Sequence, residues 1–143
     1  MLKDQFITVL KDFGELLDEE FSLDEATNTV SFTVDDDIVI NLTYLDDSDT
    51  VVIFTPVGGF GETTTLEAKA KALALLKLQD LADIAGNVTL MLDEEANLIL
   101  AADRCRAITL SSVNELSSWI EILIKAVRST RNYFTVNFAR EEE

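Results

Sequence analysis

TVVIFTPVGGF, residues 50–60, reads as a β-strand that carries apolar side chains on both of its faces and then stops at a turn rich in Pro and Gly. Successive side chains of a strand point to opposite faces, so Val52 and Phe54 share one face while Val51 and Ile53 share the other. We expect one face to pack on the protein's own helices. The fold and the function of this chain therefore depend on what covers the second face.

Four other segments have the pattern of strands, and they extend this stretch into a sheet. The five strands are expected at residues 30–34, 38–45, 50–57, 89–92 and 98–103. Acidic turns at 35–37 and 46–49 separate the first three strands, which predicts an antiparallel meander. The last two strands, joined by DEEAN at 93–97, form a second hairpin.

Three segments with apolar residues at helical spacing accompany the strands. The helices are expected at about residues 2–17, 63–87 and 113–134. Thr64 and Ser112 are each followed three residues later by Glu, so they fit capping boxes that open the second and third helices. The Gly86–Asn87 pair supplies a left-handed stop for the second helix.

The resulting element order is helix, three strands, helix, two strands, helix, without a repeat or a linker. This order predicts an α+β fold with three helices and a five-stranded, mainly antiparallel sheet. A chain of 143 residues has room for one sizeable core. We therefore expect a single domain over residues 1–136 and a frayed acidic tail at 137–143.

The charge balance is strongly acidic, with 27 Asp and Glu against 11 Lys and Arg, a net charge of −16. This charge opposes binding to nucleic acid or to an anionic membrane and favours basic or positively ended partners. No apolar run is long enough to cross a bilayer, and the N-terminus lacks the apolar core of a signal peptide. A single cysteine, Cys105, suits a reducing compartment and is best explained as a small, half-buried strand residue. These features predict a soluble, cytoplasmic protein.

The residues needed for most catalytic chemistry are missing. Histidine is absent, which removes the commonest general base and metal ligand and leaves the one cysteine without a partner for a thiol dyad. The densest carboxylates lie in predicted turns: Asp35, Asp36, Asp37, Asp46, Asp47, Asp49, Asp93, Glu94 and Glu95. A calcium loop beginning at Asp47 fails because Val51 and Val52 stand where an oxygen ligand and a glycine are needed. The sequence therefore predicts no enzyme, metal or cofactor, with a carboxylate-based hydrolase as a remote third hypothesis.

The second helix has an unusually wide apolar surface. Leu66, Ala70, Leu73, Leu76 and Leu81 form one stripe, and Ala72, Ala74, Leu75 and Leu78 extend the apolar character around most of the helix. A helix that packs on a single sheet requires a narrower apolar stripe than this. The pattern is typical of a close helix contact, or of a helix buried inside a single domain.

Several stretches together resemble a known family. They are LKDQFITVLKDFGELL, VSFTVDD, DIVINLTYLDD, TVVIFTPVGGF and TLMLDEEANLILAAD, followed by a long amphipathic helix that contains Trp119. The chain is similar in these features to the class I type III secretion chaperones, the family of the Tir chaperone. The resemblance implies a small, acidic, cytosolic homodimer without ATPase activity. Such a protein holds the N-terminal segment of a secreted effector in an extended form and presents it to the export machinery.

The resemblance also implies two sites. The effector would contact an apolar surface formed by Phe6, Leu10, Phe13, Val39, Val51 and Ile53, with backbone pairing along a sheet edge. The homodimer would form through Leu73, Ala74, Leu75 and Leu78 of the second helix. Alternatives stay open for the effector site. Its strand residues would be covered by the protein's own helices or by the dimer mate, and its residues from the first helix would belong to the core.

A rival hypothesis comes from another functional class. A regulatory module of the YbjN-like kind resembles the same fold but acts in signalling or stress responses without a role in secretion. Binding to the N-terminal segment of a secreted protein separates the two hypotheses.

Overall fold

A computed structural model of the chain describes residues 2–59, 66–81, 88–93 and 95–138, with the backbone alone for 77–81. Contacts divide the chain into two compact units. Unit 1 consists of Met1–Phe54 and Asp103–Ile122, and unit 2 of Thr55–Ala102 and Leu123–Glu143. That the chain forms one domain stays a prediction.

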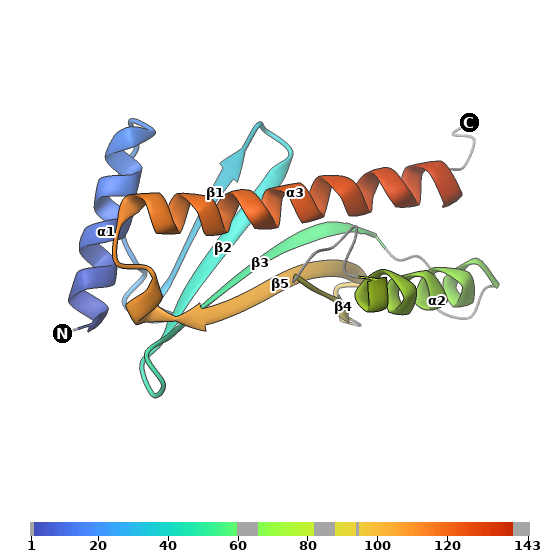
Figure 1. The fold of residues 1–143 in the computed structure, drawn as a ribbon, viewed down its shortest axis with the longest axis horizontal. Helices are drawn as coiled ribbons and strands as arrows, with labels where there is room; N and C mark the ends of the chain where they lie inside the picture. The colour runs from blue at the N-terminus through green and yellow to red at the C-terminus, as the bar shows by residue number, and fades with distance from the viewer. Residues whose placement is uncertain (1, 60–65, 82–87, 94, 139–143) are drawn as a thin grey trace. The chain divides into compact units, whose positions relative to one another are not determined.

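The described residues contain three α-helices and five strands in the expected order (Figure 1). The elements are α1 (Leu2–Leu16), β1 (Thr29–Val34), β2 (Ile38–Leu45), β3 (Thr50–Gly59), α2 (Leu66–Leu81), β4 (Thr89–Asp93), β5 (Leu98–Arg106), the 3-10 helix η1 (Ala107–Thr109) and α3 (Val113–Phe138). The strands form one sheet in the order β1-β2-β3-β5-β4. This confirms the α+β fold with a five-stranded antiparallel sheet.

Unit 1 is built on the β1-β2-β3 meander. β1 pairs antiparallel with β2, and β2 pairs antiparallel with β3 in a register that places Leu45 opposite Thr50. Asp35 and Asp36, in the first turn, have φ of 54° and 66°, and Asp49, in the second, has φ of 50°. Aspartate tolerates this left-handed conformation better than most residues, so the acidic composition of the turns has a local structural reason.

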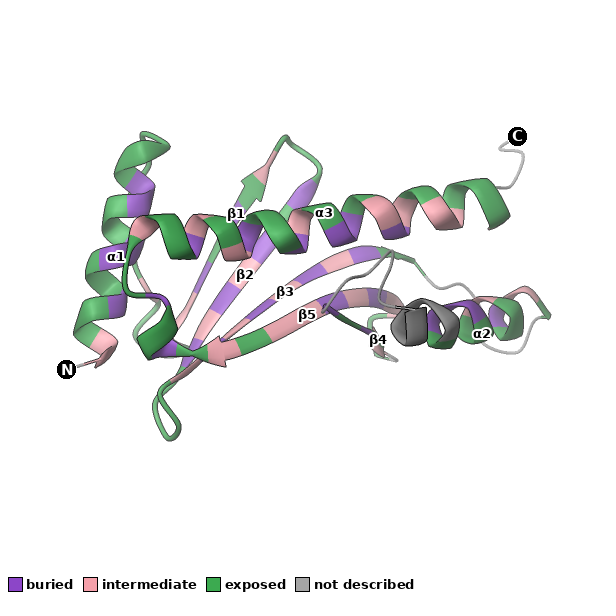
Figure 2. Ribbon diagram, in the orientation of Figure 1, coloured by how far each residue is buried: buried purple, intermediate pink, exposed green. Residues whose placement is uncertain are grey.

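The core of unit 1 lies between this meander and α1. Alternate residues of β2 are buried, and the pattern is visible along the strand in Figure 2. The ring of Phe6 on α1 lies 5.7 Å from the ring of Tyr44, and the ring of Phe13 lies 6.0 Å from that of Phe32. Each fully buried side chain of this kind contributes about 1.5 to 3 kcal/mol. Helix α1 therefore covers one face of the meander.

Unit 2 contains the β4-β5 hairpin, in which Met91 lies opposite Leu100. Helix α2 packs against β4. The Arg131 side chain, on α3, donates hydrogen bonds to the backbone oxygens of Val57 and Pro56, at 2.8 and 3.2 Å. The Arg131 guanidinium group thus satisfies two backbone carbonyl oxygens near the end of β3.

The ends of the helices agree in part with expectation. Ser112 Oγ accepts a hydrogen bond from Glu115 N at 3.4 Å, as a capping box requires, and the Glu115 carboxylate also accepts hydrogen bonds from the backbone N and the hydroxyl of Ser111, at 3.0 and 2.7 Å. Helix α3 continues to Phe138, two residues into the predicted tail. The remaining tail, 139–143, lies outside the described residues, as do Thr64 and the Gly86–Asn87 stop. No described helix has the length and apolar character that crossing a membrane requires.

Candidate functional site

The meander of unit 1 has a covered face and an open face, and Val51 and Ile53 lie on the covered one. Both side chains are 0% exposed. Val51 lies opposite Tyr44, and Ile53 opposite Leu42, in the buried row of β2. The expectation that these two residues lie on an open surface is wrong, because β3 is apolar on both faces and its own pattern does not choose between them.

The three predicted residues of α1 lie on the covered face as well. Phe6, Leu10 and Phe13 are buried. Phe13 belongs to an aromatic cluster with Phe21 and Phe32, in which the last two rings are stacked at 4.8 Å. This is the core placement given above as the alternative, so these side chains complete the fold of the chain itself.

The open face carries Val39, whose side chain is 41% exposed. Val39 shares this face with Val52 and Phe54, both of which are partly exposed. Of the six residues expected in the effector site, Val39 alone lies here. The structure therefore does not bring the six together on one surface.

Polar side chains between these apolar ones are already hydrogen-bonded to one another. Thr29 and Thr43 join their hydroxyl groups at 2.8 Å, and Ser31 Oγ donates to Asn41 Oδ1 at 2.6 Å. Asn41 Nδ2 donates in turn to Phe54 O at 3.3 Å. A partner that covered this face would bury apolar surface without leaving these groups unsatisfied.

Strand β1 is an edge of the sheet. Asn28 O accepts a hydrogen bond from Tyr44 N of β2, whereas Thr29 O points away from β2 and accepts one from Asp24 N. Because hydrogen bonding alternates along an antiparallel strand, the backbone groups of Ser31 and Thr33 point away from β2. They offer pairing positions for one additional strand.

Val52 and Phe54 lie on the open face, although the strand pattern alone predicted the opposite face of β3 to be open. A signal for them exists in the turn between β2 and β3. Four residues separate Leu45 from Thr50, and pairing those two residues places Val51 opposite Tyr44. Asn41 and Thr43 mark the other face of β2 as the polar one, so the register identifies Val52 and Phe54 as their neighbours.

The outer surface of α2 is the second candidate site. Leu73 is 63% exposed, and it lies in a stripe with Leu66 and Leu76, which are 81% and 68% exposed. Ala74 and Leu75 are buried within the chain itself, so the expectation that they are available to a second chain is wrong. The side chain of Leu78 lies outside the described residues. Figure 2 shows buried and exposed residues along the same helix.

Comparison with known protein families gives a match over most of the chain. The Tir chaperone protein (CesT) family model matches residues 8–131. The chain belongs to this family. The resemblance seen in the sequence is thereby confirmed. A search of curated proteins finds no match.

Solved structures share the fold of this CesT family chain at low identity. A chain of the HopA1–SchA chaperone–effector complex is 20% identical, with a TM-score of 0.73, and the match covers 92% of this chain and 98% of that chain. A chain of the ExsC–ExsE complex is 15% identical, with a TM-score of 0.71 and coverage of 90% and 92%. A chain of the complex of the Yersinia pestis type III secretion chaperone SycH with a fragment of YscM2 is 20% identical, with a TM-score of 0.61 and coverage of 86% and 98%.

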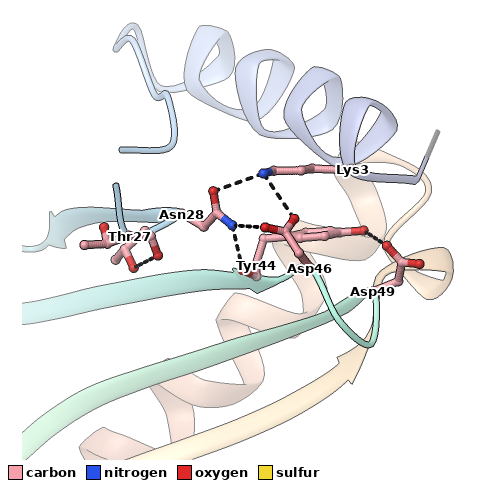
Figure 3. A network of polar contacts seen from close by, with 7 residues as sticks. Lys3, Thr27, Asn28, Tyr44, Asp46 and Asp49 are labelled. Carbon is pink, nitrogen blue, oxygen red and sulfur yellow. Dashed lines mark hydrogen bonds and ion pairs between the residues drawn. The ribbon is translucent and has the colours of Figure 1, made fainter. Parts of the chain in front are cut away.

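A polar network fixes the start of α1 in the CesT family chain (Figure 3). Lys3 Nζ lies 3.0 Å from Asn28 Oδ1 and 3.2 Å from Asp46 Oδ1. Tyr44 donates its hydroxyl hydrogen to Asp49. Burial raises the pKa of Tyr44 well above its ordinary value, and the bond to Asp49 adds to the shift. The hydrogen bond from Asn28 lowers the pKa of Asp46, with a further contribution from Lys3. The network joins α1 to the ends of β1 and β2.

Cys105 is half-buried in β5, as expected. It lines an apolar hollow with Trp119 and Ile122. Burial raises the pKa of its thiol. A thiol with a raised pKa is protonated near neutral pH and is a poor nucleophile, which fits a structural residue.

Proposed function

We propose that this protein is a type III secretion chaperone that binds the N-terminal segment of a secreted effector in extended form. The family match over residues 8–131 carries the proposal. Similar folds occur in the HopA1–SchA chaperone–effector complex and in the SycH complex. In this role the chain binds and releases a polypeptide, breaks no bond and needs no cofactor.

The open face of unit 1 is the surface proposed for the effector. Its apolar side chains, Val39, Val52 and Phe54, each contribute about 1.5 to 3 kcal/mol when a partner buries them fully. Several such contacts offset the entropy of ordering an unfolded segment. The free edge of β1 adds backbone pairing, which fixes the register of the bound chain. Binding of this kind keeps the effector soluble and competent for export.

The exposed stripe of α2 is the surface proposed for the homodimer. Three large leucines on one side of a helix form an apolar patch of the kind that marks a protein interface. A symmetric pair of protomers would place the same stripe on both sides of the contact. The interface therefore consists of Leu66, Leu73 and Leu76 rather than Ala74 and Leu75.

Capture of a client by open-face variants tests the proposed function. The clients are the N-terminal segments of secreted proteins encoded by neighbouring genes, co-produced with the chaperone. Val39→Asp places a charge in the contact, and we expect the affinity for the client to fall about tenfold or more. Ile108→Asp is the matched control, because Ile108 is also exposed in unit 1 but lies on η1.

The outcome separates three readings. Equal capture by the wild type and Val39→Asp removes the open face as the site. Unfolding of Val39→Asp, seen by circular dichroism, assigns Val39 to the core. A wild type that captures no secreted segment, together with altered transcription on deletion of the gene, favours the YbjN-like regulatory role.

A further inference from the structure

The basic residues of the described strands are confined to one end of β5. Arg104 and Arg106 are the only Lys or Arg residues in the strands that the structure describes, and both are exposed. They stand two positions apart in a chain whose net charge is −16. The two exposed guanidinium groups therefore form a small positive patch on a negatively charged protein.

The neighbours of these arginines show which face they occupy. Trp119 Nε1, on α3, donates a hydrogen bond to Asp103 Oδ2 at 2.8 Å, so Asp103 points toward α3. Cys105 is half-buried and lines the hollow beside Trp119. Because side chains alternate along a strand, Arg104 and Arg106 point to the opposite face, which is the open face.

The arginines also lie next to the apolar part of that face. Ala107 N donates a hydrogen bond to Asp49 O at 2.8 Å, which aligns the end of β5 with the start of β3. Continued antiparallel pairing from this bond places Arg104 beside Val52 and Arg106 beside Thr50. The two guanidinium groups therefore border the surface that Val39, Val52 and Phe54 form.

Among the described residues, no carboxylate forms an ion pair with the guanidinium group of Arg104 or of Arg106. A guanidinium group has a planar set of donors that matches a carboxylate. Exposed charges beside an apolar surface leave room for a complementary charge on the bound chain. The rest of this acidic protein repels such a charge, so the attraction is confined to this end of the face.

We propose that the bound client segment carries two acidic residues, two positions apart, that pair with Arg104 and Arg106 while its neighbouring apolar residues cover Val39, Val52 and Phe54. This inference rests on the proposed function and specifies the chemistry of the client. An extended chain repeats its side-chain direction every second residue, so an acidic-x-acidic spacing matches the spacing of the arginines. The charge pairs fix the direction and register of the client, and the apolar contacts supply most of the affinity.

Two labelled synthetic peptides test this inference. Both consist of alternating Thr and Val or Leu, and one ends in Asp-Thr-Asp while the other ends in Asn-Thr-Asn. We expect the wild type to bind the Asp peptide about fivefold more tightly in fluorescence anisotropy at low salt, because exposed ion pairs are individually weak. The preference should shrink as ionic strength rises.

The preference should disappear in the double variant Arg104→Gln, Arg106→Gln. The matched control is Lys11→Gln with Lys69→Gln, which removes the same two charges from exposed positions on α1 and α2 and should keep the preference. Binding of the Asn peptide, and its loss in Val39→Asp, reports on the open face independently of the arginines.

Four results overturn the inference. Equal binding of both peptides by the wild type removes the charge pairing while leaving the proposed function intact. Loss of the preference in the lysine control shows a general charge effect. A change in the mass of the free protein on replacement of the arginines, measured by light scattering, shows that a second copy of the chain covers this face. Failure of both peptides to bind removes the open-face site together with the inference.

Discussion

Helices α1 and α2 have nearly the same length, 15 and 16 residues, and both are rich in apolar side chains. They differ in whether their large apolar side chains are buried or exposed. The large side chains Phe6, Leu10 and Phe13 of α1 are buried on the sheet of unit 1. The large side chains Leu66, Leu73 and Leu76 of α2 are exposed, while the small Ala68 and Ala74 are buried together with Leu75.

The difference indicates two uses of an apolar helix. Helix α1 completes the core of its own protomer, so its contacts determine whether unit 1 folds. Helix α2 keeps its leucine stripe exposed, and this stripe is the surface proposed above for the homodimer. The same substitution should therefore lower the stability of the protomer in α1 and the affinity of assembly in α2.

The largest effect is expected in α1. Leu10→Ala removes a fully buried side chain and leaves a cavity, so we expect the free energy of unfolding to fall by about 2 to 5 kcal/mol. Urea unfolding followed by circular dichroism measures the change. Leu16→Ala is the control in the same helix, because Leu16 is exposed, and it should change stability by no more than about 0.5 kcal/mol. Equal effects of the two substitutions would contradict the role given to α1.

The next effect is expected in α2. Leu73→Asp or Leu76→Asp would bury an unpaired charge in the proposed dimer contact, and we expect the dimer dissociation constant to rise by about 100-fold or more with the protomer still folded. Sedimentation equilibrium measures it. Leu75→Asp is the contrasting variant and should unfold unit 2, because Leu75 is buried within the protomer. A dimer that survives both outward substitutions would place the interface elsewhere.

The sequence predicted the elements well, and for physical reasons. Strand β2 was predicted with its observed bounds, Ile38–Leu45, because its alternation is regular and acidic turns precede and follow it. The cap at Ser112 gave the start of α3. In each case the determining contacts are local, so the residues that fix the element lie within a few positions of one another.

The faces were harder to predict, because they depend on partners far away in the chain. Val51, Val52, Ile53 and Phe54 are all apolar, so the strand itself fits either orientation, and the pairing with β2 decides it. Helix α2 has the same ambiguity, since leucine and alanine occur on all sides. Apolar periodicity identifies a buried face only when polar residues occupy the other one.

The smallest effect is expected in the polar network that holds α1. Asp46 has a lowered pKa in the folded protein, so it contributes stability above the ordinary carboxyl pKa of about 3.9, and this contribution is lost as the pH falls through the lowered value. Asp46→Asn should therefore be slightly less stable than the wild type at neutral pH, and the difference should vanish in acid. High salt should also reduce it, because Lys3 and Asp46 are partly exposed.

Asp47→Asn is the matched control for this prediction, because Asp47 lies in the same turn without a hydrogen bond or ion pair to another described residue. Urea unfolding at a series of pH values measures all three proteins. A difference between the wild type and Asp46→Asn that persisted unchanged to low pH would show that the carboxylate charge is not what holds Lys3. The start of α1 would then depend on its apolar contacts alone, and α1 would differ from α2 only in which side chains it buries.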